Sequence, residues 1–316
     1  MEKTNRESIV TVVPYDPNWP KLFALEAEEL RNILKNNCVT IHHIGSTAIP
    51  DLVAKPVIDL LIIVHDLEQL AKQSFALEKM GYLNKGEHGI AFRRFFQKKS
   101  PHPFNVHVYE IGNPEIDRHL LFRDWLCQHR EDRERYATLK LQLAKQYPNN
   151  IEKYCNGKNN FVLEIDAKDG FTGWRMVHAF TEEEWSTVRY LRNYYFFKTF
   201  EDPYTWTFKE INHVHFVYYQ KATRVGYCHI QLWPENRAAL RIIAIDENFR
   251  QKGIGSSFLL LCEKWLKSRG TKELLIQSNS AALSFYKKNG YSPMPFNDPE
   301  GNETDPQDTE LGKKLF

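Results

Sequence analysis

The chain has 316 residues, of which 42% are hydrophobic and 26% are charged, and its formal net charge is +2. This near-neutral net charge gives no reason to expect a nucleic acid as a partner. No apolar run approaches the length of a membrane span, and residues 1–7 are too polar for a signal peptide, so we expect no membrane insertion and a cytoplasmic location. The five cysteines are far apart and match neither a disulfide framework nor a zinc pattern, so we expect reduced thiols and no bound metal.

Two apolar segments in the first half predict neighbouring strands around a glycine-serine turn. Residues 41–44 lead into Gly45 and Ser46, and residues 57–64 are apolar apart from Asp59. Binding of two metal ions needs carboxylates that converge, commonly two positions apart on one face of a strand. Leu61 stands at that spacing from Asp59 and cannot bind Mg²⁺, so the motif for Mg²⁺ is incomplete.

Other polar residues of the first half leave alternatives open. His107 lies in an alternating strand pattern and is either a ligand or a core histidine, and the core role is favoured for a lone strand histidine. Lys55, Lys140 and Lys158 either bind phosphate or, as exposed lysines usually do, only increase solubility.

The amino-acid sequence of the first half resembles the sequences of the GrpB family. The similarity runs over residues 43–59, where the family signature contains a histidine, the Gly-Ser turn, Ala-Lys-Pro and an aspartate, and extends from about residue 10 to residue 162. It implies a nucleotidyltransferase-like mixed sheet with helices, whose reaction is unassigned. It also implies a nucleotide or phosphate site, composed of Gly45, Ser46, Lys55, Asp59, His107 and Lys158.

A polar, glycine-bearing segment at residues 166–173 predicts the boundary between two domains, residues 1–168 and residues 172–316. A strand is expected from Trp174, and Thr181 followed by Glu184 predicts a helix that begins with a capping box. Residues 213–219 and 225–233 alternate as antiparallel strands do, and the histidines among them are expected to have polar partners across the strands.

The segment at residues 242–256 changes from an apolar strand to a basic turn with two glycines and then to a helix, expected from about Gly255 to Ser268. Gly253 and Gly255 carry no side chains that would keep a diphosphate away from the backbone amides. The helix start directs free N–H groups and the positive end of its dipole to the same place. A phosphorylated cofactor is therefore the first hypothesis.

Three ordered motifs in this half resemble the GNAT acyltransferases. The turn from Arg250 to Gly255 is similar to their acetyl-CoA turn, the segment from Asn279 to Gly290 is similar to their asparagine, helix and tyrosine signature, and residues 310–315 resemble their last strand. The similarity covers about residues 172–316 and implies a fold with a central mixed sheet.

The GNAT resemblance also implies roles for individual residues. Backbone groups of Ile243 and Ile245 would bind the pantetheine arm and the thioester carbonyl, Asn279 would contact the pantetheine chain, and Tyr286 would protonate the departing thiolate. Tyr286 and Asn279 also have structural alternatives, as a core tyrosine and a capping residue. No general base is identified. The diphosphate would lie on a turn composed of Arg250, Gln251, Lys252, Gly253, Ile254, Gly255 and Ser256.

The sequence thus predicts a two-domain α/β (α+β) protein that acts as an acetyl-CoA-dependent N-acetyltransferase on a small-molecule or peptide amine. Two alternatives remain: a bifunctional enzyme whose first domain transfers nucleotidyl groups, and a non-catalytic sensor of CoA or nucleotides. The identity of the amine and the oligomeric state are not encoded in any motif.

Overall fold

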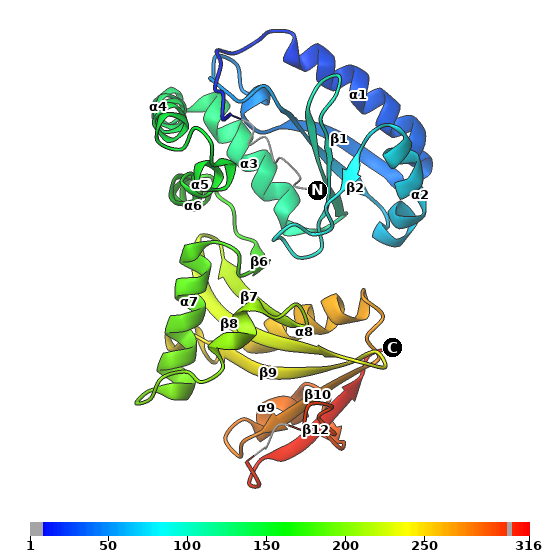
Figure 1. Ribbon diagram of the computed structural model, residues 1–316, viewed down its shortest axis with the longest axis vertical. Coiled ribbons are helices and arrows are strands. Elements are labelled where there is room, and N and C mark those ends of the chain that lie inside the picture. The colour runs from blue at the N-terminus through cyan, green and yellow to red at the C-terminus, as the bar shows by residue number, and fades with distance from the viewer. Residues whose placement is uncertain (1–8, 302–304) are drawn as a thin grey trace, which may run out of the picture. The chain divides into compact units, whose positions relative to one another are not determined.

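The computed structural model describes residues 9–301 and 305–316, which fall into two compact units. The first unit comprises residues 9–88 and 92–173, and the second comprises Gly89–Ala91 with residues 174–301 and 305–316. Each unit contains one mixed sheet with helices (Figure 1). The prediction of a mixed α/β fold class is therefore confirmed. None of the helices formed by these residues is long and apolar enough to cross a bilayer.

The first unit has a five-stranded sheet with the strand order β1-β2-β5-β4-β3. Only the pair β2 and β5 is parallel. The strands are β1 (Cys38–Ile44), β2 (Ile58–Val64), β3 (Leu83–Asn84), β4 (Arg94–Lys98) and β5 (Phe104–Glu110). The helices are α1 (Trp19–Leu34), α2 (Leu67–Lys79), α3 (Pro114–Gln128), α4 (Arg130–Gln146), α5 (Ile151–Asn156) and α6 (Asn159–Lys168).

The two faces of β2 have different environments because successive side chains of a strand alternate. Leu60, Ile62 and Val64 belong to the core shared with α1 and α2. Asp59 lies on the opposite face, beside Asn105 and His107 of β5.

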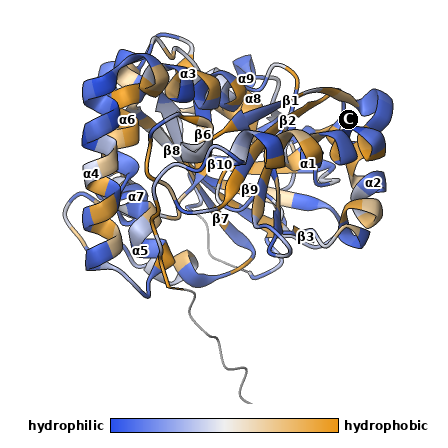
Figure 2. Cartoon of the chain, turned by 90° about the horizontal axis from the view of Figure 1, so that it is seen from above, coloured by the Kyte–Doolittle hydropathy of each residue, from blue (hydrophilic) through white to orange (hydrophobic). Residues whose placement is uncertain are grey.

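The colouring of the helices by hydropathy, with blue and orange mixed along their lengths, agrees with helices that bury one face (Figure 2).

The second unit has a seven-stranded sheet with the order β11-β12-β10-β9-β8-β7-β6, in which only β9 and β10 are parallel. Its strands are β6 (Trp174–His178), β7 (His213–Gln220), β8 (Thr223–Trp233), β9 (Arg237–Ile245), β10 (Glu273–Ser278), β11 (Ser292–Pro293) and β12 (Thr309–Lys314). Its helices are α7 (Glu182–Arg192), α8 (Ile254–Lys267) and α9 (Leu283–Lys288).

Helices α7 and α8 cover opposite faces of this sheet. Tyr227 of β8 contacts Arg192 of α7, whereas the next residue, Cys228, contacts Cys262 of α8. The predicted capping box is present: the Thr181 hydroxyl accepts from the Glu184 N–H, and the Glu184 carboxylate accepts from the Thr181 N–H.

Several buried polar side chains on the α7 side bond one another, as predicted for the strand histidines. His213 Nδ1 lies 2.8 Å from His229 Nε2, and His215 Nδ1 lies 2.7 Å from the Tyr227 hydroxyl. The Tyr227 hydroxyl also accepts from Arg192. These cross-strand polar contacts match the prediction for the strand histidines.

We expect Gly45→Ala to destabilise the first unit. Gly45 has φ 68° and ψ −171°, a conformation that is essentially restricted to glycine. An added Cβ would also lie 2.4 Å from Asp59 Oδ2. The expected loss in free energy of unfolding is about 3 kcal/mol or more, measured by hydrogen exchange of the β1 and β2 amides in urea. Gly112→Ala is the matched control, because Gly112 also has a positive φ, 83°, but a Cβ added there meets no atom within 4 Å. Equal losses of unfolding free energy in the two variants would contradict the steric argument.

Asp202→Asn should destabilise the second unit by about 3 to 5 kcal/mol, because it leaves the Arg192 charge buried without its partner. Arg192 is fully buried and donates to both carboxylate oxygens of Asp202, at 2.5 and 2.9 Å. Hydrogen exchange of the α7 and β8 amides measures the change. Glu182→Gln removes an exposed ion pair with Arg189 from the same helix and should cost about 0.5 kcal/mol or less. A comparable loss of unfolding free energy in both variants would refute the assignment of this loss to the buried charge of Arg192.

Candidate functional site

Strand β9 is followed by a turn in which two residues have unusual backbone conformations. After Ile245, the Asp246 carboxylate accepts from the Asn248 N–H and begins a short 3-10 turn. Gln251 and Gly253 then have φ values of 60° and 76°, and α8 begins at the residue after Gly253. A Cβ on Gly253 would meet no atom within 4 Å, so glycine is required there by the backbone conformation rather than by space.

Gly255 also has a packing role that the sequence does not reveal. A Cβ at this position would lie 3.3 Å from the ring of Phe285 and 3.6 Å from the side chain of Ile245. Gly255 therefore lets the first turn of α8 pack closely against these two apolar side chains. Its contact with a diphosphate stays a prediction.

The backbone of β9 leaves one edge free near the turn. The Asp246 N–H donates to the Val225 carbonyl, which places Asp246 and Ala244 on the edge facing β8. Because the groups of an antiparallel strand alternate between edges, Ile243 and Ile245 direct theirs to the other side. On that side β9 pairs with β10, but among the described residues the pairing ends at Ala239.

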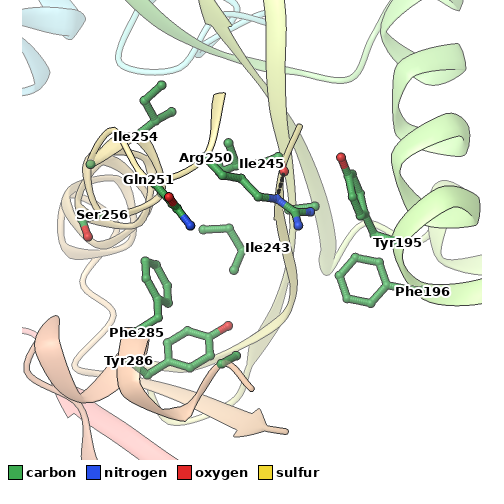
Figure 3. A pocket seen from close by; sticks show the side chains of 14 residues that line it. Tyr195, Phe196, Ile243, Ile245, Arg250, Gln251, Ile254, Ser256, Phe285 and Tyr286 are labelled. Atoms are coloured by element: carbon green, nitrogen blue, oxygen red, sulfur yellow. Dashed lines mark hydrogen bonds between the residues drawn. The ribbon is translucent and has the colours of Figure 1, made fainter. Parts of the chain in front are cut away.

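The free edge of β9, the turn and α9 enclose a cavity of about 370 Å³. In Figure 3 the Tyr286 hydroxyl points into this space, and the Ile243 side chain lies between Phe285 and Arg250. The lining residues are Tyr195, Phe196, Ile243, Ala244, Ile245, Arg250, Gln251, Gly253, Ile254, Gly255, Ser256, Ala282, Phe285 and Tyr286.

Tyr286 is positioned by aromatic packing in α9. Its ring lies 5.1 Å from the ring of Phe285 and 5.7 Å from that of Tyr291. Burial, with a smaller contribution from Cys228, raises the pKa of Tyr286 above its ordinary value. The phenol therefore keeps its proton at neutral pH, and its hydroxyl is available to donate into the cavity.

The basic side chains of the turn are held by the protein itself. Arg250 Nε donates to the Ile245 carbonyl at 2.8 Å, and its guanidinium lies 4.3 Å from the centre of the Tyr195 ring. Figure 3 shows this hydrogen bond beside the cavity. Lys252 does not line the cavity, and its ammonium donates to the Asn248 carbonyl at 3.1 Å. The turn thus presents backbone amides more than side-chain charge.

Asn279 lies outside the cavity lining. Its side-chain oxygen accepts from the Ala282 N–H at 3.0 Å, which forms the turn that leads into α9. This capping contact matches the structural alternative for Asn279, and its contact with pantetheine stays a prediction. Helix α9 begins at Leu283, directly after this turn.

Sequence reasoning missed the aromatic wall made by Tyr195 and Phe196. They belong to the turn Asn193–Phe197, which follows α7 and lies about fifty positions before the glycine turn. The Tyr195 hydroxyl accepts from the Glu247 N–H at 2.8 Å, which fixes this wall against the strand end. A run of aromatic residues, Tyr194 to Phe197, was the available signal.

In the first unit, the predicted residues gather around Asp59. Its carboxylate accepts from Asn105 Nδ2 at 2.9 Å and lies 3.8 Å from His107 Nε2. Burial opposes ionisation of Asp59, but hydrogen bonds from His107 and Asn105 together lower its pKa. Residues 9–301 and 305–316 contain no group of three or more His, Cys, Asp or Glu side chains that could bind a metal ion. The structure therefore gives no support to an Mg²⁺ site.

The lysines of this region differ from the expectation of exposed, solubilising side chains. Lys140 is only 1% exposed, and Lys55 and Lys158 are half-buried. The ammonium of Lys140 donates to the Ser46 hydroxyl at 3.0 Å. The sequence prediction of exposure is wrong for Lys140, because α4 packs over the Gly45 turn.

The two units match two different families of known proteins. The model of the family described as GrpB protein matches residues 9–168, and that of the Acetyltransferase (GNAT) family matches residues 177–291. UPF0157 protein YqkA of Bacillus subtilis is 45% identical over 164 residues, covering 50% of this chain and 47% of that protein. UPF0157 protein BH1888 of Halalkalibacterium halodurans is 39% identical over 156 residues, covering 49% of this chain and 80% of that protein. The chain thus spans about half the length of YqkA.

Solved structures resemble each unit. Conserved protein GrpB from Enterococcus faecalis has a TM-score of 0.48 and 40% identity, covering 50% of this chain and 96% of that chain. The paia N-acetyltransferase from Thermoplasma acidophilum, in complex with coenzyme A, has a TM-score of 0.34 and 18% identity, covering 45% of this chain and 99% of that chain.

The GNAT family match supports an acyltransferase activity for the second unit. The two family matches follow one another along the sequence without overlap. The chain belongs to the GrpB family and carries, after its GrpB domain, a domain of the GNAT acetyltransferase family.

Proposed function

We propose that the second unit transfers an acetyl group from acetyl-CoA directly to an amine. The observation that carries this proposal is the meeting of three features at one cavity: the free edge of β9 at Ile243, the turn that begins α8, and the hydroxyl of Tyr286. The family match is in accord with it.

The residues of the cavity fit the parts of this cofactor. The helix start at Ile254, with Gln251, Gly255 and Ser256 beside it, presents backbone N–H groups and a positive dipole end, which suit a diphosphate. The free groups of Ile243 suit the amides of a pantetheine arm, in the manner of an added strand. Acetyl-CoA supplies the acetyl group as an activated thioester.

Tyr286 is proposed as the proton donor to the thiolate sulfur. Its burial keeps the phenol protonated, and its hydroxyl faces the side of the cavity where Ile243 lies. The acceptor is proposed to be a small-molecule or peptide amine, and we assign no general base. A sensor that binds CoA without transferring acetyl groups is the second candidate, and the measurements below distinguish it.

The first prediction of this proposal concerns binding. Ser256→Glu should weaken CoA binding to the full chain by about tenfold or more, because it adds a negative charge to the cavity lining where the diphosphate is proposed to lie. Calorimetric titration measures the affinity. The control is Ser257→Glu, which adds the same charge to the same helical turn but at an exposed residue outside the lining. Absence of CoA binding by the unaltered chain would refute both the enzyme and the CoA sensor.

The second prediction concerns turnover. Tyr286→Phe should lower kcat about 100-fold with little change in CoA affinity, because it removes a proton donor and keeps the ring packing. Acetylation of an amine pool, followed by mass spectrometry, measures turnover. Tyr190→Phe on α7 removes an exposed hydroxyl and should leave kcat unchanged. Unchanged turnover in Tyr286→Phe would exclude Tyr286 as the acid, and CoA binding without any transfer would favour the sensor.

A further inference from the structure

The segment that follows α7 carries a concentration of exposed aromatic side chains. Five of the nine exposed Phe, Tyr and Trp side chains of residues 9–301 and 305–316 lie within residues 194–206. They are Tyr194, Phe196, Phe200, Tyr204 and Trp206. Single exposed apolar side chains are normal on a protein, whereas several in one short segment are typical of a surface that binds another molecule.

Polar contacts fix this segment, so the exposure of its rings does not come from a loosely packed loop. Arg192 donates to both carboxylate oxygens of Asp202, at 2.5 and 2.9 Å, and thereby joins the two ends of the loop between them. The Asp202 carboxylate also accepts from the Tyr204 N–H at 2.9 Å. Within the loop, the buried ring of Phe197 lies 5.6 Å from the ring of Phe200. A preorganised backbone therefore presents the exposed rings, which reduces the entropy lost on binding.

Phe196 connects this segment with the cavity of the second unit. It lines the cavity and is 41% exposed. In Figure 3 it lies across the cavity from Phe285 and Tyr286. Tyr195, the other member of the aromatic wall, is already engaged, because the Arg250 guanidinium lies 4.3 Å from the centre of its ring. No ring or cation in the described part of the chain makes such a contact with Phe196.

The walls of the cavity have different tasks in the proposed reaction. The edge of β9 and the turn before α8 are proposed to hold the pantetheine arm and the diphosphate, and Tyr286 is proposed to protonate the sulfur. The amine attacks the carbon bonded to that sulfur, so its substituent extends along a wall that the cofactor does not use. Phe196 belongs to the wall that remains. An apolar ring on the acceptor would bury the exposed part of Phe196 and add aromatic packing.

We infer that the acceptor carries an aromatic or similarly large apolar group close to its amino group, and that Phe196 is the specificity-determining residue that packs against this group. This inference rests on the proposed acetyl transfer and names the class of amine that the cavity selects. In the reaction the nitrogen forms a bond to the acetyl carbon and the carbon–sulfur bond breaks. The nitrogen loses one proton and the thiolate gains one from Tyr286, so atoms and charge balance.

Acceptor selectivity of the full chain tests the inference with two matched pairs of primary amines. Phenethylamine and ethanolamine carry a ring and a hydroxyl on the same two-carbon chain. Phenylalanylglycine and serylglycine differ in the same way beside an α-amino group, so the two pairs separate a small-molecule acceptor from a peptide. In at least one pair, kcat/KM should be about tenfold or more higher for the aromatic amine.

Phe196→Ala should reduce this preference to about twofold or less, mainly by raising KM for the aromatic amine, because the lost contact is the same in the ground state and the transition state. Phe196→Tyr keeps the ring and should retain the preference. The matched control is Leu260→Ala on α8, which removes an apolar side chain that is 64% exposed and lies outside the cavity lining. This control should leave the preference unchanged.

Binding measurements separate a failure of this inference from a failure of the proposed function. If no amine is acetylated, the proposed acetyltransferase is refuted. Calorimetric titration of phenethylamine and ethanolamine into the full chain then decides the inference. It requires tighter binding of phenethylamine, weakened about tenfold by Phe196→Ala and unchanged by Leu260→Ala.

Three results would overturn the inference. The first is equal kcat/KM within both pairs of amines. The second is a preference for the aromatic amine that Phe196→Ala leaves unchanged, which would assign the selection to another residue. The third is a dimer in sedimentation experiments that dissociates in Phe196→Ala and is unaffected by phenethylamine, which would identify a second copy of this chain as the molecule that covers Phe196.

Discussion

The architecture of the second unit depends on where the pairing of β9 with β10 stops. The two strands are in register only from Arg237 to Ala239, and beyond that point the edge of β9 has no strand beside it. Backbone groups of Ile243 are thereby left for another partner, although most strand edges inside a sheet are occupied. The Ile245 carbonyl on the same edge accepts from Arg250. The cavity lies beyond the point where this pairing ends, between the end of β9, the turn that leads into α8, and α9.

The two units place polar groups in different environments. In the second unit the turn presents neutral backbone dipoles, while Arg250 is engaged by the Ile245 carbonyl. In the first unit the full charge of the Lys140 side chain is withdrawn from water beside Ser46. Dipoles fixed by a fold need no counter-charge when no ligand is present. A buried ammonium group does, and burial, with the charge of Lys158, lowers the pKa of Lys140 to about 7.

Local patterns were sufficient to predict most elements of the second unit. The capping box at Thr181, the helix α8 and the strand β12 lie within about two residues of their expected positions, because capping and periodicity are short-range signals. The aromatic wall of the cavity was not predictable in this way. Tyr195 reaches the site through packing between segments that are distant in sequence, and no local pattern records such a contact.

Burial explains the remaining differences between expectation and structure. Lys140 has the sequence environment of a surface lysine, and only the packing of α4 over a turn ninety-four positions earlier withdraws it from water. Asp59 was recognisable as an unusual acid in an apolar strand, whereas its lysine neighbours were not identifiable as a group. Gly255 makes room for Phe285, and only the tertiary packing reveals this contact.

The hydrogen bond from Arg250 to the Ile245 carbonyl has a consequence for the kinetics of ligand capture. It joins the end of β9 to the middle of the turn, and the turn is further fixed by the Asp246 cap and by Tyr195. A binding loop that is already ordered loses little conformational entropy when its ligand arrives. The turn then acts as a rigid template, so that slow steps in entry or release would originate in the aromatic wall or in α9 rather than in the glycine-containing segment itself.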